Sequence, residues 1–319
     1  INRRSNDLPR ATLSVSELVE LTIEFYRRNY IEGLFLSSGV VRSPDYTMER
    51  LVRVAKDLRQ VHRFNGYIHL KSIPGASREL VNEAGLYADR LSVNVEIPKE
   101  ENLKLLAPEK DHKSVFAPMK YIQQGVLESK EERQKFRHAP RFAPAGQSTQ
   151  MIVGATSESD KDILYLSSAL YGRPTMKRVY YSGYVSVNTY DTRLPALKQP
   201  PLVRENRLYQ ADWLLRFYQF KVDEIVDDAY PDLDLEIDPK LSWALRHPEQ
   251  FPVDINKADY EMLLRVPGIG VKSAKLIVAS RRFSRLGFYE LKKIGVVMKK
   301  AQYFITCREL PLQMQTVNE

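Results

Sequence analysis

Helical and strand-like patterns alternate along the first two thirds of the chain. Apolar residues recur at helical spacing in some segments and at every second position in others. These patterns predict helices at 14–29, 47–64, from 77, at 100–136, 159–171 and 204–220, and strands at 32–38, 66–73, 90–96, 149–155 and 176–187. Strands separated by helices are joined by right-handed crossovers and form a parallel sheet. We therefore expect an α/β fold.

The series begins with a helix, at 14–29, whereas a repeated strand–helix unit begins with a strand. We therefore expect a partial (β/α)6 barrel, similar to a TIM barrel, whose first strand and first strand–helix loop lie upstream of Ile1. In parallel barrels the active site is built from the loops at the carboxyl ends of the strands. Polar residues at strand ends are thus the first candidates for a site.

The composition changes after residue 220. Residues 223–238 contain eight Asp or Glu residues, with Pro231 inside this run and Pro239 directly after it. Such a composition favours a linker or a docking strap. The predicted domains are therefore a barrel at 1–220, an acidic linker at 221–250 and a small all-α module at 251–319.

One motif in the last module has a clear physical meaning. In "LLRVPGIGVKSAKLIV", at 263–278, two helical runs flank a turn that contains two glycines. Glycines let a backbone approach a phosphate closely, and the N–H groups that begin the second helix can bind it. This is the helix-hairpin-helix pattern, which contacts nucleic-acid backbone without reading the sequence. The candidate binding residues are Gly268, Ile269, Gly270, Lys272 and Lys275.

A weaker second copy follows at 291–305, "LKKIGVVMKKAQYFI", and adds Gly295 at the equivalent turn. The balance of charge supports a phosphate-binding role: from Asp254 onward the chain has 12 Lys or Arg and 6 Asp or Glu, within a net charge of +8. The alternatives are a solvated basic face and a hairpin with a purely structural role. Base-excision chemistry is disfavoured, because no Asp follows Asp259 to activate a nucleophile.

Cysteine use and hydropathy suggest a cellular setting. Cys307 is the only cysteine of the sequence, so no disulfide can form within it, which fits a reducing compartment. No run approaches the roughly 18 apolar residues that would span a bilayer. We expect a cytoplasmic protein that has no membrane partner.

Several longer segments together resemble one family: "INRRSND", "EGLFLSSGV", "HLKSIPGAS", "RLSVNVE", "APAGQSTQMIVGATSESD", "RVYYSGYVSV" and "LLRVPGIGVKSA". The chain is similar over essentially its whole length to the radical S-adenosylmethionine superfamily, and within it to the DNA modification or repair radical proteins, which carry a partial barrel followed by helix-hairpin-helix. The resemblance implies two cofactors, S-adenosylmethionine and a [4Fe–4S] cluster held by a Cys-x-x-x-Cys-x-x-Cys loop. One-electron reduction then yields a 5′-deoxyadenosyl radical.

In that family "INRRSND" directly follows the last cluster cysteine, so the three cluster ligands are expected upstream of Ile1. Cys307 cannot replace them, and no metal ligand is expected in this chain. The resemblance also implies nucleic acid, with DNA favoured over RNA, as the substrate. It further implies an electron donor such as flavodoxin or ferredoxin and a DNA-repair partner protein.

The resemblance also implies a cofactor site along the strand ends. Ser37, Ser38 and Gly39 stand where the family has a turn that holds the substrate amino group. Lys71 would pair with the methionyl carboxylate. Ser92 and Asn94 would bind the ribose.

The adenine side would be formed by the last two strands. The residues at the matching positions are Ile152, Gly154, Glu158 and Tyr181. Tyr180 and Tyr181 point to opposite faces of a strand, so at most one lines the barrel interior. The bland alternative for Lys71, Ser92 and Asn94 is an ordinary role at the barrel rim.

Three functions therefore remain open. The first is a radical S-adenosylmethionine enzyme that acts on DNA or RNA after a base is displaced into the barrel. The second is a nucleic-acid-binding protein that keeps the barrel as a scaffold without catalysis. The third is a radical enzyme for a protein or small molecule. The sequence singles out no catalytic residue and does not distinguish repair from modification.

Overall fold

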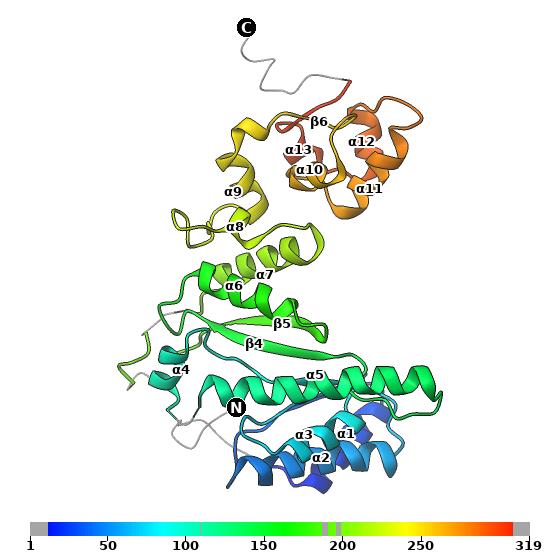
Figure 1. The fold of residues 1–319 in the computed structure, drawn as a ribbon, viewed down its shortest axis with the longest axis vertical. Helices are drawn as coiled ribbons and strands as arrows, with labels where there is room; N and C mark the ends of the chain where they lie inside the picture. Colours follow the sequence, from blue (N-terminus) through cyan, green and yellow to red (C-terminus); the bar gives the residue numbers. More distant parts are fainter. Residues whose placement is uncertain (1–11, 109, 187–190, 196–198, 309–319) are drawn as a thin grey trace. The chain divides into compact units, whose positions relative to one another are not determined.

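The computed structural model describes residues 12–108, 110–186, 191–195 and 199–308. The chain divides into two compact units (Figure 1), Ile1–Glu158 with Ala169–Pro201 and Ser159–Ser168 with Leu202–Glu319. The second unit includes the whole segment that composition marks as an acidic linker. The expected cluster loop and the segment "INRRSND" lie outside the described residues.

The first unit contains a five-stranded sheet. Its strands are β1 (Gly33–Leu36), β2 (Tyr67–Lys71), β3 (Arg90–Ser92), β4 (Gln147–Val153) and β5 (Met176–Gly183). They pair in chain order, and every pair is parallel. This confirms the α/β class and the parallel sheet, while the barrel itself stays a prediction.

The register divides the sheet into an apolar and a polar face, because successive side chains of a strand point to opposite sides. Leu36, Leu70 and Leu91 lie side by side on one face and are fully buried. Helices cover this face, since α5 contacts β4 and α3 contacts β3. Phe35 and His69 form the pair that precedes Leu36 and Leu70 in β1 and β2, so their side chains point to the other face. The polar residues at the strand ends therefore lie beside the polar face of the sheet and not beside its buried apolar face.

The helices of the first unit are α1 (Val15–Arg27), α2 (Pro44–Gln60), α3 (Arg78–Tyr87), α4 (Glu100–Leu106) and α5 (His112–Lys135). Figure 1 shows α5 running alongside β4, with α1, α2 and α3 grouped together. The predicted helical region 100–136 is two helices, because Asp111 starts a new one: its carboxylate accepts the N–H of Ser114 at 2.6 Å. Helix α2 starts earlier than expected, at Pro44, whose missing N–H is tolerated in a first turn.

The second unit begins with the start of α6 (Asp160–Tyr171) and continues with α7 (Leu202–Phe217), α8 (Val222–Ile225), α9 (Pro239–Arg246) and a short 3-10 turn, η1 (Pro248–Gln250). The acidic segment is folded here, and it buries Val226, Leu233 and Trp243. The buried carboxylate of Asp160 anchors it by accepting the N–H of Leu233 at 2.9 Å. Apolar side chains of this segment are thus buried in the fold.

The C-terminal module has four helices, α10 (Tyr260–Arg265), α11 (Val271–Ser280), α12 (Phe288–Ile294) and α13 (Met298–Ala301). The expectation of an all-α module is wrong in one detail. Strands β6 (Val253–Asp254) and β7 (Ile305–Thr306) pair in parallel and bring the two ends of the module together. Two-residue strands are too short to show an alternating pattern in the sequence.

Candidate functional site

Two glycine turns define the candidate nucleic-acid interface. Gly268 has a φ of 87° and Gly295 a φ of 93°, a left-handed conformation that glycine adopts without strain. The apolar positions of the first motif form the core of the module, since Leu263, Val266 and Ile269 are almost completely buried. Both predicted hairpins are therefore present, α10–α11 and α12–α13.

The two hairpins support each other at their turns. The N–H of Val297, which caps α13, donates to the carbonyl of Gly268 at 2.9 Å. A Cβ at Gly268 would lie only 2.6 Å from the Val297 carbonyl oxygen, so glycine is also required there by space. Gly295 in turn lies near the first turn of α11, with the Ser273 hydroxyl oxygen 3.8 Å from a Cβ built on it. Each turn thus packs against the start of the other hairpin's second helix.

The start of α11 has the features of an anion site. Gly270 is its N-cap and provides no capping side chain, and no acidic residue lies in the first turn. Lys272 and Lys275 are exposed, and within the described part of the chain neither belongs to an ion pair. Backbone N–H groups, the helix dipole and two lysines therefore favour negative charge at this point.

Residues outside the motif also contact the turn between α10 and α11. Lys240 of α9 is buried and donates from Nζ to the Ile269 carbonyl at 2.6 Å, while it lies 4.8 Å from the ring centre of Tyr218. Burial lowers the pKa of Lys240 to about 7. Burial raises the pKa of Tyr218, although its hydroxyl accepts the N–H of Val271, which lowers it in part. No pattern in the sequence links Lys240 to a turn 29 residues away.

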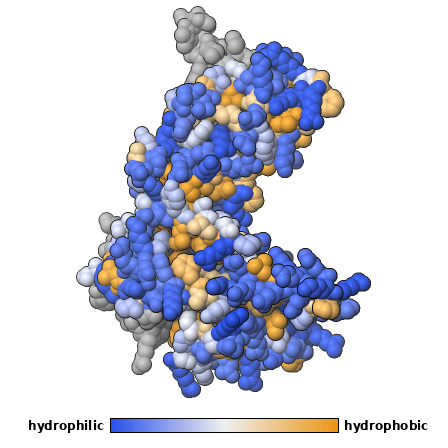
Figure 2. Space-filling model, in the orientation of Figure 1, coloured by the Kyte–Doolittle hydropathy of each residue, from blue (hydrophilic) through white to orange (hydrophobic). Residues whose placement is uncertain are grey.

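The module also carries a broad set of exposed cations. Beyond the two lysines of α11, they are Arg282, Arg285, Lys292, Lys293 and Lys299. Lys300 is different, because it pairs with Asp238 at 2.6 Å. Figure 2 shows hydrophilic residues over much of this module, with small apolar patches between them. The charge excess of the sequence is therefore on the surface, where a polyanion can reach it.

Polar residues also gather where the parallel strands end. Lys71 lies directly beside Ser92 in the register of β2 and β3, and its Nζ is 3.3 Å from the Glu96 carboxylate. Lys110 reaches the same carboxylate at 3.9 Å. Asn94 donates to the side-chain oxygen of Gln150 at 3.2 Å. Lys71 is thus brought together with Ser92 and Glu96, while the side chain of Asn94 binds Gln150 of β4.

The other predicted cofactor residues are more widely spread. Ser37, Ser38 and Gly39 follow the end of β1, where the Ser38 hydroxyl donates to the Gly39 carbonyl at 2.7 Å. Ile152 lies next to the last residue of β4, on the polar face. Their predicted roles stay predictions.

Three of the adenine-side positions have structural partners of their own. Gly154 has a φ of 82°, and a Cβ there would meet Pro201 at 3.0 Å. The buried carboxylate of Glu158 accepts from Asn102 at 2.8 Å. Tyr181 is 2% exposed and lies on the apolar face beside Met151, so the tyrosine on the polar face is Tyr180. The side chain of Tyr181 therefore lies on the buried face, and its predicted role stays a prediction.

His69 is a further polar group on this face that the sequence analysis did not select. Its Nε2 lies 3.2 Å from the Ser148 hydroxyl, and its ring meets Phe35 edge to face at 4.8 Å. Burial, followed by the nearby Arg90 guanidinium, lowers the pKa of His69 to about 4. A histidine on the polar side of an alternating strand is the signal that could have identified it.

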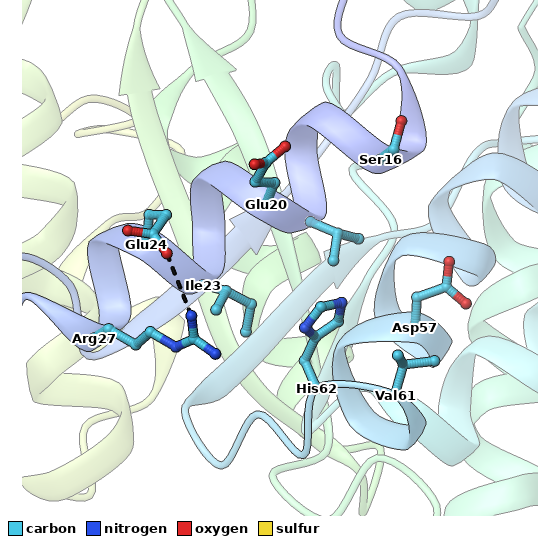
Figure 3. Close-up of a pocket in the computed structure, with 9 residues that line it drawn as sticks. Ser16, Glu20, Ile23, Glu24, Arg27, Asp57, Val61 and His62 are labelled. Carbon is cyan, nitrogen blue, oxygen red and sulfur yellow. Dashed lines mark hydrogen bonds and ion pairs between the residues drawn. The ribbon is translucent and has the colours of Figure 1, made fainter.

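A surface groove of about 490 Å³ lies elsewhere, between α1 and the end of α2. Figure 3 shows His62 facing α1 from the end of α2, and the ion pair between Glu24 and Arg27, whose charged atoms are 3.4 Å apart. None of the predicted site residues lines it. The groove therefore belongs to the helical layer and not to the strand ends.

The described residues include no group of three or more His, Cys, Asp or Glu side chains that could hold a metal ion. Cys307 is buried in the core of the hairpin module. The donor set of the described residues therefore does not fit a [4Fe–4S] cluster, which requires several thiolates. Among the same residues, no helix is long and apolar enough to cross a membrane.

Comparison with known protein families found one similarity. Residues 249–301 match the helix-hairpin-helix motif, and this range contains both glycine turns. None of the curated proteins compared with the chain matches it. The match confirms the predicted hairpins and indicates nucleic-acid binding by this segment.

Proposed function

We propose that the C-terminal module binds the sugar–phosphate backbone of DNA or RNA, and that it contributes affinity and not sequence selectivity. The observation that carries this proposal is the first turn of α11, which directly follows a glycine turn and contains no acidic residue. Lys272 and Lys275 are exposed beside it, and neither belongs to an ion pair among the described residues. Backbone N–H groups donate hydrogen bonds to the phosphate oxygens of any nucleotide equally well. The support of each hairpin by the other holds both turns in position for one strand.

A matched pair of charge reversals tests this proposal. The double variant Lys272→Glu with Lys275→Glu removes two cations at the turn, and Lys130→Glu with Lys135→Glu makes the same change in net charge on exposed positions of α5. The first variant should weaken binding to a labelled duplex by about tenfold or more and make the slope of log affinity against log salt shallower by about 2. Equal effects of the two variants would instead indicate attraction by net charge alone.

We propose as a second function that the polar strand ends bind S-adenosylmethionine. The resemblance described above suggests it, and the pairing of Lys71 with Glu96 supports it, because a cation and a carboxylate suit the carboxylate and amino group of a methionine. Asn94 and Ser92 would then hold the ribose hydroxyls. When bound to a reduced [4Fe–4S] cluster, this cofactor supplies a 5′-deoxyadenosyl radical. Because the described residues do not fit the cluster, we derive no step through it.

Calorimetric titration with S-adenosylmethionine tests the second proposal. Lys71→Ala should weaken binding about tenfold, as expected when a charge-assisted hydrogen bond is lost. The control is Lys104→Ala, which removes an exposed lysine that pairs within α4. Unchanged affinity in Lys71→Ala would remove Lys71 from the site. Iron and sulfide content of the polypeptide made from the whole gene, purified without oxygen, then separates the radical enzyme from a scaffold that only binds nucleic acid.

A further inference from the structure

The connection between α11 and α12 is held firmly at both ends. At its start, Arg281 donates to the carbonyls of Ile255 at 3.0 Å and Ala258 at 2.5 Å. At its end, Asn256 and Leu286 exchange two hydrogen bonds, of 2.8 and 3.1 Å. The residues between these two anchors therefore form a loop whose two ends are fixed to the rest of the module.

The tip of this loop exposes an aromatic ring between two cations. Phe283 is 90% exposed, more than any other large hydrophobic side chain in the described ranges. Its N–H donates to the Ser280 carbonyl at 3.0 Å, which fixes the backbone below the ring. Arg282 and Arg285 are exposed on either side, and within the described part of the chain neither side chain has an ion-pair partner. The ring contributes almost nothing to the core, so the fold alone does not explain it.

We propose that Phe283 stacks on an unpaired or displaced base while Arg282 and Arg285 bind the phosphates on either side. This inference rests on the proposed nucleic-acid binding and specifies its substrate as a nucleic acid with accessible bases. A phenyl ring stacks on any base, and guanidinium groups bind phosphates in two-pronged fashion. The absence of acidic residues from 281–287 fits a polyanionic partner.

The distance from the tip to the first turn suits one strand. Helix α11 has 10 residues between them, which corresponds to about 15 Å, or about four nucleotides at 3.4 Å along a helical strand. A single strand can therefore place one phosphate at the turn and a base against Phe283. An intact duplex keeps its bases stacked and offers the ring no partner without an energetic cost.

The test compares three labelled probes of about 20 nucleotides, a length that exceeds common single-strand site sizes. They are a single strand, its duplex, and the duplex with one unpaired 2-aminopurine. Phe283→Ala should weaken binding to the single strand and to the unpaired site by about 5- to 100-fold and should change duplex binding by less than about twofold. The 2-aminopurine emission should fall on binding of the wild type and of Phe283→Trp, and should not fall with Phe283→Ala.

The outcomes separate this inference from the proposed function. Equal affinities of Phe283→Ala and the wild type for all three probes, with binding still dependent on Lys272 and Lys275, would overturn the stacking role alone. Binding to no probe by the wild type would overturn both. Phe283→Ala should unfold at the temperature of the wild type because the ring is exposed. If it does not, Phe283→Trp against Phe283→Gln provides the same comparison of aromatic and non-aromatic side chains.

Discussion

Lys240 is a buried cation whose protonation depends on folding. Burial lowers the pKa of its ammonium group to about 7 from the 10.5 that the unfolded chain regains. Between these values the unfolded state binds more protons than the native state, so Lys240 makes the free energy of unfolding rise as the pH rises from about 7 to about 10.5. Lys240→Met should remove this contribution, as urea denaturation across that range can measure.

Other groups also titrate in this range, so the informative quantity is the difference between wild type and variant. Lys257→Met is the control, because it makes the same replacement at a lysine whose side chain is 84% exposed. A difference between wild type and Lys240→Met that stays constant with pH would show that Lys240 keeps an ordinary pKa.

His69 makes a second prediction at this scale. Because burial lowers the pKa of His69 to about 4, its ring stays neutral as the pH falls through the usual 6.5. An NMR titration of the ring protons should give a midpoint near 4, and the spectrum of His69→Gln assigns the signal. A midpoint near 6.5 would mean that water reaches the polar face freely.

Among single residues, the sequence predicted those that obey a local rule. Gly268 and Gly295 follow from the motif, because only a tight left-handed turn requires glycine at that spacing. The contacts of Lys240 and Glu96 could not be predicted from the sequence, because their partners are distant in the chain or lie on another strand. From the sequence, at most one of Tyr180 and Tyr181 can lie on a given face of the strand. Only the register shows that Tyr180 is the one on the polar face.

At the scale of elements, the two turns should differ in their tolerance of a side chain. Gly268→Ala places a side chain in a left-handed conformation and also brings its Cβ too close to the Val297 carbonyl. Gly295→Ala has the strained conformation without such a close contact. We expect Gly295→Ala to cost about 1 kcal/mol and Gly268→Ala about 3 kcal/mol or more of unfolding free energy. Urea denaturation followed by circular dichroism measures both. Equal costs would show that the turns do not brace each other.

The elements that the sequence predicted well are those with a long, regular pattern. The five strands and the helices of the first unit lie close to their expected positions, because each buries one periodic face. The acidic segment illustrates the limit of composition. Its charges predicted a linker, which stays a prediction, and composition gave no sign that Val226, Leu233 and Trp243 are buried.

At the scale of the whole molecule, Arg265 joins the hairpin module to the acidic segment within the second unit. Its guanidinium lies 2.7 Å from the Glu224 carboxylate and also donates to the carbonyls of Tyr218 and Gln219. Arg265→Ala should lower the free energy of unfolding of this unit by about 2–4 kcal/mol, because it leaves two carbonyls without this donor and the Glu224 carboxylate without its cation. Emission of the buried Trp243 during urea unfolding checks it.

Arg265→Lys is a useful companion, since it keeps the charge and loses the fork of donors. It should recover only part of the loss. The exposed pair of Lys257 and Asp254 sets the scale for a surface contact, and its removal should change the unfolding free energy by less than about 1 kcal/mol. Equal losses at both pairs would argue that Arg265 is a surface contact too.

The hydrogen bond from Val297 to Gly268 has a consequence for any strand that binds. The two turns cannot change their separation without breaking this hydrogen bond, so the distance between them is fixed. A strand must bring its phosphates to that spacing, and flexible or already distorted nucleic acid does so at a lower energetic cost than a stiff one. The module would then select its target by mechanical compliance, with no base read at all.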